Sequence, residues 1–392
     1  MRTRAVGWVL GLILTVGCGG TVVGVSGSGG ATDAGGSGET STSGGAGNTS
    51  GGAGNTKGGA GNTKGGAGNT KGGAFGEGGA TLAEGGAASV GGAAATPNVG
   101  SVLASPGCAK PPPMVQPRGS YVKYTTAVSG KTLDPQFSVS PHERDYYVWL
   151  PISYEPTKPT RITFLFMGCG DRNAASTATY KLMKQDPDSI YVAMNMPPVG
   201  YPPTGKDCYD VTVGKQSVEW EFMGLTASAV QKSFCVDENR LFVAGYSSGS
   251  TIANMFGCYF AGRDPSRQFG ADISVRGQSG VTGIPVQPDV PCAGRVAAFW
   301  LHDSDDKENV IGGNSMVSLP RVLTFNGCTG GVAGKTAPFG SLESLSAVCK
   351  RYVDCPPEYP VVFCTTSGVG HSAQDALALP GFIEFQNLMS HK

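Results

Sequence analysis

Short apolar runs alternate with longer amphipathic segments along the chain beyond residue 113. Runs of this length are typical of buried strands, and the segments between them are long enough to form covering helices. We predict strands at residues 146–150, 162–167, 189–194, 241–244, 272–277, 296–302 and 361–365, and helices at residues 217–233 and directly after residue 247. This alternation predicts an α/β fold in which helices flank a mostly parallel sheet. Such a sheet binds its substrate at the carboxyl ends of its strands.

The chain begins with a segment of a different kind. Arg2 and Arg4 precede an apolar stretch at residues 6–16, which is too short to span a bilayer and has the form of a secretory signal. Gly17 stands directly before Cys18, as at a bacterial lipoprotein processing site. We therefore predict a signal peptide at residues 1–18 with lipid attachment at Cys18, which would hold the protein on a membrane surface without a spanning helix. Ordinary secretion after cleavage is the alternative.

Residues 19–105 form a linker of Gly, Ala, Ser, Thr and Asn with almost no large apolar side chain. A seven-residue unit occurs four times, at residues 44–50, 51–57, 58–64 and 65–71. No apolar position recurs in it, so a coiled coil is excluded and a flexible tether is predicted. The folded domain is expected to span residues 106–392.

The charge and cysteine patterns exclude two classes of function. The 29 basic and 29 acidic residues balance, and no basic stripe is present, which disfavours nucleic-acid binding. No cysteine pair has the close spacing of a zinc site, so neither a metal nor another cofactor is expected. Ten of the eleven cysteines lie between Cys108 and Cys364. An even set in an exported domain predicts up to five disulfides.

The most informative motif is Gly245-Tyr246-Ser247-Ser248-Gly249, which follows the apolar run at residues 241–244. A strand that leads into G-x-S-x-G is the signature of a serine nucleophile elbow. The flanking glycines allow a strained strand-to-helix turn that lifts the hydroxyl of Ser247 above the sheet. We therefore predict Ser247 as a nucleophile.

A serine nucleophile needs a base and an acid that orients the base. Of the four histidines, His371 is the candidate base, because it alone lies in a glycine-bearing loop after the last predicted strand. The acid should follow the preceding strand, where three aspartates stand together at Asp303, Asp305 and Asp306. A solvated turn is the alternative explanation for such a group. The order serine, acid, histidine along the chain is that of an α/β-hydrolase.

An oxyanion hole needs two backbone N–H donors. In this fold one comes from the residue after the nucleophile, which is Ser248, and one from the loop after the third strand. That loop is predicted at residues 167–170, with the N–H of Cys169 as donor.

The region from about Gly107 to the end of the chain contains a series of short motifs in order: Arg144 with Tyr147, Leu150-Pro151, Gly168-Cys169-Gly170, Cys208-Tyr209-Asp210, Cys235-Val236-Asp237 with Arg240, the elbow, Asn326-Gly327-Cys328, Cys349 with Tyr352 and Cys355, and Phe363-Cys364 before Gly370-His371. In these motifs the region resembles secreted α/β-hydrolase esterases of the polyhydroxybutyrate depolymerase and feruloyl esterase group. In that family the acid stands four residues after the histidine of an His-Gly-Thr-x-Asp motif. The resemblance therefore selects Asp306 as the acid.

The chain departs from the family pattern at four positions. Met167 replaces a histidine, Ser250 and Asp303 replace glycines, and Ser372 follows His371 without a nearby tryptophan. These departures bear on the substrate pocket and the rate more than on the type of reaction. They keep open a second hypothesis, a catalytically impaired surface lipoprotein with a binding role on the same fold.

Strand ends limit the disulfide pairings within this resemblance. Cys169 follows the carboxyl end of a strand and Cys235 precedes the amino end of its neighbour, a separation of roughly 15 Å, whereas a disulfide allows about 7 Å between Cα atoms. We therefore expect Cys169 with Cys208, Cys258 with Cys292, and Cys108 with Cys235. The other four are expected to pair among themselves, most simply as Cys349 with Cys355 and Cys328 with Cys364.

The prediction is a monomeric serine esterase that needs no cofactor and acts through an acyl-enzyme on carboxylic esters. The resemblance implies feruloyl esters of plant cell walls or hydroxyalkanoate polymers as substrates, and a location outside a bacterial cell or on its surface. Tyr201, Tyr209 and Trp220 are candidates for an aromatic pocket, with ordinary packing as the alternative. A peptidase or lipase on the same fold is a narrower alternative.

Overall fold

The computed structural model describes residues 101–112, 116–130, 142–170, 181, 184–196, 208–209, 218–262, 274–281, 292–309 and 315–389. The predicted signal segment, Cys18 and the repeats lie outside these residues. No helix in the described ranges is long and apolar enough to cross a membrane.

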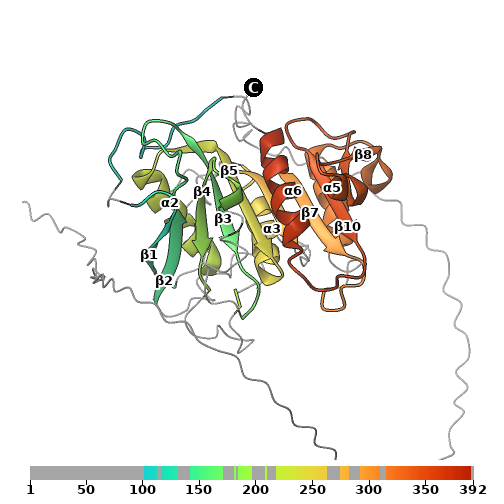
Figure 1. The fold of residues 1–392 in the computed structure, drawn as a ribbon, viewed down its shortest axis with the longest axis horizontal. Helices are drawn as coiled ribbons and strands as arrows, with labels where there is room; N and C mark the ends of the chain where they lie inside the picture. The colour runs from blue at the N-terminus through green and yellow to red at the C-terminus, as the bar shows by residue number, and fades with distance from the viewer. Residues whose placement is uncertain are drawn as a thin grey trace, which may run out of the picture. The chain divides into compact units, whose positions relative to one another are not determined.

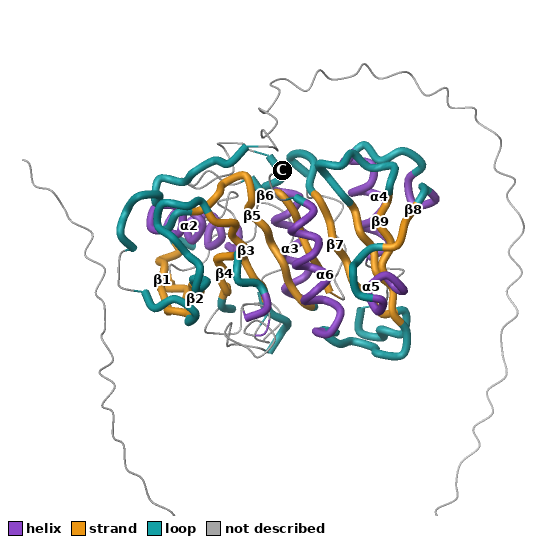
Figure 2. Tube along the Cα trace, turned by 45° about the horizontal axis from the view of Figure 1, so that its top comes forward, coloured by secondary structure: helices purple, strands orange, loops and turns teal. Residues whose placement is uncertain are grey.

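The described residues form one ten-stranded sheet (Figure 1). Its order is β1-β2-β4-β3-β5-β6-β7-β10-β9-β8. The strands are β1 (Tyr121–Val128), β2 (His142–Trp149), β3 (Thr160–Phe166), β4 (Ser189–Met194), β5 (Val236–Tyr246), β6 (Val275–Val281), β7 (Ala297–Asp303), β8 (Thr336–Pro338), β9 (Cys349–Tyr352) and β10 (Val361–Thr366). The six central strands from β4 to β10 run parallel, whereas β1, β2, β8 and β9 pair antiparallel with their neighbours. Figure 2 shows β1 and β2 at one end of the row and β8 and β9 at the other.

Helices cover both faces of this sheet. They are α2 (Val218–Ser233), α3 (Ser248–Tyr259), α4 (Ser315–Asn326), α5 (Glu343–Val348) and α6 (Asp375–Leu388), with a 3₁₀ turn at Gly331–Ala333. Successive residues of a strand face opposite sides. On β6, Gly277 faces Phe385 of α6, and the next residue, Gln278, lies against Gly257 of α3. The two helices therefore pack on opposite faces of β6.

This architecture is the α/β-hydrolase fold, and the predicted fold class is confirmed. The crossover from β3 through β4 to β5 and the antiparallel β2 give the strand order of that fold. The predicted strand at residues 272–277 was placed too early, because β6 carries the buried polar side chains Arg276, Gln278 and Ser279 and has little apolar signal. Strands β1, β8 and β9 were missed because they are polar or short. The sequence placed His142 before the first predicted strand, whereas in the structure His142 is the first residue of β2.

The folded domain begins earlier than residue 106. Ala104 forms a bridge with Asp237 of β5. The Oγ of Ser105 donates to the carbonyl of Phe234, and the N–H of Leu103 donates to the Asp237 carboxylate. Residues 101–105 therefore belong to the domain and not to the predicted linker, because their backbone hydrogen bonds are made by β5.

The ten cysteines of the domain form five disulfides, and three pairings agree with expectation: Cys108–Cys235, Cys169–Cys208 and Cys258–Cys292. The other two predicted pairings are wrong. The structure joins Cys328 to Cys355 and Cys349 to Cys364. Cys349 lies directly opposite Cys364 on the antiparallel pair β9 and β10. This pairing was not predicted because β9 was not among the predicted strands.

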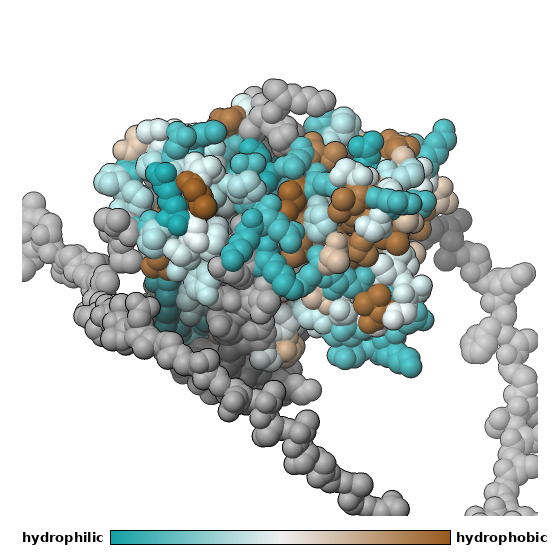
Figure 3. Space-filling view, viewed as in Figure 1, coloured by the Kyte–Doolittle hydropathy of each residue, from teal (hydrophilic) through white to brown (hydrophobic). Residues whose placement is uncertain are grey.

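The face in Figure 3 is largely hydrophilic, with hydrophobic residues in separate patches.

The core is apolar but contains a buried ion pair beside α2. Both nitrogens at the end of the Arg144 guanidinium bind Glu219, at 3.2 and 2.9 Å, and the guanidinium also donates to the carbonyl of Asn195. It lies 4.3 Å from the centre of the Phe222 ring. This pair joins β2 to α2, so its geometry fixes how the helix sits on the strand.

We expect Arg144→Met to lower the free energy of unfolding by about 3–5 kcal/mol, because it leaves a carboxylate buried without its cation. Arg144→Met combined with Glu219→Leu should recover most of the loss. Urea unfolding checks both. The control is Lys123→Met, which breaks the exposed Lys123–Asp145 pair and should cost less than about 1 kcal/mol. Equal losses at both sites would contradict the prediction.

Peptide mapping of the non-reduced protein should recover Cys328 linked to Cys355 and Cys349 linked to Cys364. The register of β9 against β10 places Cys349 opposite Cys364, and the N–H of Thr329 donates to the carbonyl of Asp354 at 3.2 Å, which brings Cys328 beside Cys355. Recovery of Cys349 with Cys355 would mean that this register is wrong.

Candidate active site

Ser247 occupies a strained turn between β5 and α3. Its backbone angles are φ 54° and ψ −122°, a region that side-chain-bearing residues rarely adopt. A Cβ at Gly245 would collide with the carbonyl of Gly249, and one at Gly249 would collide with the carbonyls of Phe166 and Met167. The two glycines of the motif are therefore required by close backbone contacts, as the sequence pattern predicted.

The structure brings together the three predicted residues. The Oγ of Ser247 lies 3.0 Å from Nε2 of His371. Nδ1 of the same imidazole lies 2.9 Å from Oδ2 of Asp306. The Asp306 side chain is fully buried and that of His371 is 12% exposed. Three loops, which follow β5, β7 and β10, thus converge on one imidazole.

Asp306 is held by backbone donors on its other oxygen. The N–H groups of Glu308 and Asn309 each lie 2.9 Å from Oδ1. Burial acts to raise the pKa of Asp306, but the hydrogen bonds from Asn309, His371 and Glu308 outweigh it, and the pKa lies below its ordinary value. The carboxylate is therefore ionised at neutral pH and accepts a hydrogen bond from the imidazole.

His302 is a neighbour of this carboxylate that the sequence analysis set aside. Its Nε2 lies 2.6 Å from the carbonyl of Asn309 and 3.5 Å from Oδ2 of Asp306. Burial lowers the pKa of His302, although the Asn309 carbonyl and Asp306 act in the opposite direction. A neutral imidazole that donates to Asn309 shapes the turn from which the Asn309 N–H reaches Asp306. His142 lies in β2 and His391 lies outside the described residues.

The three aspartates at the end of β7 and directly after it have separate contacts. Asp306 binds the imidazole, whereas Asp303 and Asp305 bind the loop that carries it. The carboxylate in contact with the imidazole is thus that of Asp306, the aspartate that the resemblance selected.

The two segments that carry the predicted oxyanion donors both adjoin Ser247. Ser248 opens α3, and the first N–H groups of a helix have no partner within it. In the other segment, a Cβ at Gly168 would lie 3.4 Å from the Cβ of Ser247, so the loop after β3 runs directly beside the serine. The loop is fixed by the Cys169–Cys208 disulfide and by the N–H of Met167, which donates to the hydroxyl of Tyr209 at 3.1 Å. That hydroxyl in turn donates to the carbonyl of Met194 at 2.5 Å.

Two of the three predicted pocket residues are packing residues. Tyr209 is 2% exposed and supports the loop after β3. Trp220 is 1% exposed and packs against Tyr259 in the core. Tyr201 lies outside the described residues. The predicted aromatic pocket is therefore corrected: the side chains of Tyr209 and Trp220 pack in the protein interior and do not line a pocket.

Tyr246 was not predicted as a site residue, although it stands directly before Ser247. Its hydroxyl donates to the carbonyl of His371 at 3.2 Å, and the two rings lie 5.4 Å apart. Burial raises the pKa of Tyr246, with Glu308 and Asp306 adding to the effect. The only sequence signal for it was its place inside the elbow motif.

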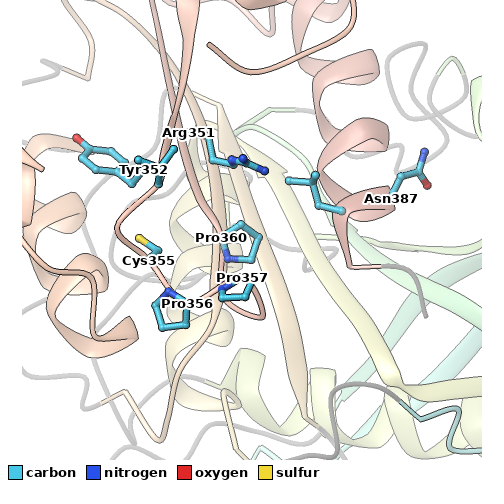
Figure 4. A pocket seen from close by; sticks show the side chains of 9 residues that line it. Arg351, Tyr352, Cys355, Pro356, Pro357, Pro360 and Asn387 are labelled. Atoms are coloured by element: carbon cyan, nitrogen blue, oxygen red, sulfur yellow. The ribbon is translucent and has the colours of Figure 1, made fainter. Parts of the chain in front are cut away.

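A cavity of about 460 Å³ lies away from these residues (Figure 4). It is lined by Arg351, Tyr352, Val353, Cys355, Pro356, Pro357, Pro360, Asn387 and Leu388. Pro360 directly precedes β10, so the cavity is at the amino end of this strand and His371 follows the other end. Within the described ranges, no group of three His, Cys, Asp or Glu side chains is arranged to hold a metal ion.

No family model and no curated protein matches the chain. Among solved structures, an acetyl xylan esterase from Aspergillus awamori is 13% identical with a TM-score of 0.45, over 68% of this chain and 99% of that one. A ferulic acid esterase is 16% identical with a TM-score of 0.43, over 69% and 99%. A thermostable esterase is 13% identical with a TM-score of 0.41, over 68% of this chain and 60% of that one. Because these TM-scores are low, we assign the fold class from the strand order of the sheet and from the elbow, and not from the similarity to these structures.

We expect Asp306→Asn to be less stable than the wild type at neutral pH, by about 1–3 kcal/mol, because the amide cannot satisfy all the donors around it. The pKa of Asp306 is lowered on folding from 3.8. Its stabilising effect is therefore full above that value and is lost as the pH falls through the folded-state pKa. Urea unfolding at a series of pH values should show that the difference in free energy of unfolding between the two proteins, the stability gap, becomes smaller as the pH falls. A gap that stays constant or widens would contradict this.

Proposed function

We propose that this chain is a serine hydrolase that cleaves carboxylic esters. The observation that carries the proposal is the continuous contact from Ser247 Oγ through the His371 imidazole to Asp306, at 3.0 and 2.9 Å. A nucleophile, a base and an orienting acid in this order form the arrangement that activates a serine. Ser247, His371 and Asp306 are the proposed catalytic residues.

In this mechanism the hydroxyl of Ser247 donates its proton to Nε2 of His371 as the oxygen attacks the ester carbonyl. Asp306 accepts a hydrogen bond from Nδ1, which keeps the tautomer with a free Nε2 lone pair and stabilises the imidazolium. The N–H groups of Ser248 and Cys169 are proposed to bind the oxyanion of the tetrahedral intermediate. The imidazolium then protonates the departing alcohol, which leaves an acyl group on Ser247. Water then gives a proton to the imidazole as its oxygen attacks the acyl carbon, and the bond from that carbon to Ser247 Oγ breaks as the imidazolium returns the proton to Oγ, which releases the acid.

The departures from the family pattern leave this contact chain intact. The Met167 backbone is held by Tyr209, and Ser250 is buried within α3. Asp303 contacts the loop of His371 and not its ring. The hydrogen-bond chain therefore favours an enzyme over a binding protein that has lost its activity.

The proposed substrates are feruloyl esters or hydroxyalkanoate esters, which rest on the resemblance of the motifs around these residues. Export is supported by five disulfides, which form and persist in oxidising compartments. Attachment to a membrane through Cys18, and a monomeric state, complete the proposal.

Ser247→Ala should reduce the turnover of p-nitrophenyl acetate by about 1000-fold or more, because the attacking oxygen is removed. Thr226→Val is the control, since this threonine is buried in α2 and its hydroxyl has no partner among the described residues. It should retain the wild-type rate. Circular dichroism should show that both variants fold.

A wild type without ester turnover, or a Ser247→Ala variant as active as its parent, would overturn the proposal and favour the binding role. Methyl ferulate, hydroxybutyrate oligomers and tributyrin tested side by side distinguish the substrate classes. A preference for tributyrin would favour a lipase.

A further inference from the structure

The loop that carries His371 has no regular structure of its own. It leaves β10 at Thr366 and turns at Gly368 and Gly370, whose φ angles are 78° and 69°. A Cβ at either glycine would meet nothing within 4 Å, so the loop is not wedged in place by side-chain packing there. An imidazole on such a loop reaches a fixed position only if the loop backbone is anchored.

The anchor is Asp303, the last residue of β7. Its side chain is buried, and Thr366 is its register partner on β10. Oδ2 accepts hydrogen bonds from the Thr366 hydroxyl at 2.8 Å and from the Val369 N–H at 3.1 Å. Oδ1 accepts the N–H of Asp305 at 2.8 Å. One carboxylate therefore joins the two loops that hold Asp306 and His371.

Further bonds between the same loops support this anchor. Oδ2 of Asp305 accepts the N–H of Gly368 at 2.6 Å. The N–H of Ser304 donates to the carbonyl of Thr366 at 2.9 Å. Asp305 is exposed, so its bond competes with water, whereas that of Asp303 does not.

Asp303 is charged when it makes these contacts. Burial acts to raise the pKa of Asp303, but donors from Asp305, Thr366, Val369 and Gly370 outweigh it and lower the pKa below its ordinary value. Hydrogen bonds to an ionised acceptor are roughly twice as strong as neutral ones.

We propose that Asp303 is a positioning residue that sets the imidazole of His371 between Ser247 and Asp306 by anchoring the backbone of residues 366–370. The inference rests on the proposed function and adds a residue to it. We call Asp303 with its bonds to Thr366, Val369 and Asp305 the Asp303 clasp. A glycine at this position has no side chain to make these bonds, so the departure from the family pattern supplies the clasp in this chain.

The test is Asp303→Asn, which keeps the shape of the side chain. Whichever way the amide is turned, its NH₂ faces a backbone N–H, either of Asp305 or of Val369. The clasp must therefore open on one side. We expect kcat to fall by about 10- to 100-fold with KM little changed, because a small displacement of the imidazole affects the chemical step.

Asp237→Asn is the matched control. Asp237 is also buried, and its Oδ1 accepts the N–H groups of Leu103 and Asn239, at 3.1 Å each. It lies at the amino end of β5, whereas Ser247 follows the carboxyl end. Its substitution should lower stability without changing kcat.

A second pair of variants changes the clasp from the other loop. Thr366→Val removes the hydroxyl that donates to Asp303, and Thr366→Ser keeps it. The hydroxyl also lies 2.9 Å from Oε1 of Gln374, a contact that valine removes and serine keeps, so Gln374→Asn, which shortens this side chain, is the control and should leave kcat unchanged. We expect the valine to lower kcat and the serine to restore it. This pair decides the proposal if Asp303→Asn does not fold.

A spectroscopic reading separates positioning from general stability and needs no turnover. The proton shared by His371 Nδ1 and Asp306 should give a far-downfield proton NMR signal. We expect it in the wild type and in Asp237→Asn, and expect it weakened or lost in folded Asp303→Asn and Thr366→Val. If the wild type cleaves no ester, the proposed function fails while this signal still tests the clasp. A folded Asp303→Asn variant with the kcat and the NMR signal of the wild type would overturn the inference. If Asp303→Asn does not fold, a Thr366→Val variant with the kcat and the signal of the wild type would overturn it.

Discussion

The two hydrogen-bond contacts of the His371 imidazole are the constraint on which the rest of the site depends. They join Ser247 and Asp306 to a histidine on a third loop. Ser247 and Asp306 are 59 positions apart along the chain. Parallel strands make this possible because β5, β7 and β10 all end at the same edge of the sheet. Each loop begins where its strand stops, so the sheet sets the distances among the three side chains.

Each of these loops is fixed by a different kind of contact. At the serine, the glycines allow backbone atoms to approach so closely that the strained φ of Ser247 is maintained. At the acid, backbone N–H groups hold one carboxylate oxygen and leave the other for the imidazole. At the histidine, Asp303 binds the loop backbone. The loop after β3 is tied down by a disulfide and a buried tyrosine.

The predictions from the sequence succeeded where the chemistry is local. The elbow is five consecutive residues, and each of its glycines stands two positions from Ser247. Long apolar strands such as β3, β4 and β7 were found because burial on both faces leaves a continuous apolar run. Strand β6 was misplaced because polar side chains are buried on it, and the pairing of Cys349 was missed because Cys349 lies on β9, which is short and polar.

The sequence by itself determined the α/β fold class and the serine elbow, placed His371 in the last loop and, through the motif resemblance, selected Asp306. Only the tertiary structure decided that these three side chains are in contact, how Cys328, Cys349, Cys355 and Cys364 pair, and that Tyr209 and Trp220 are packing residues. The reason is physical: residue spacing along one strand and turn reports local backbone geometry. Contacts between the ends of separate strands depend on strand order and register, which arise from the packing of the whole sheet.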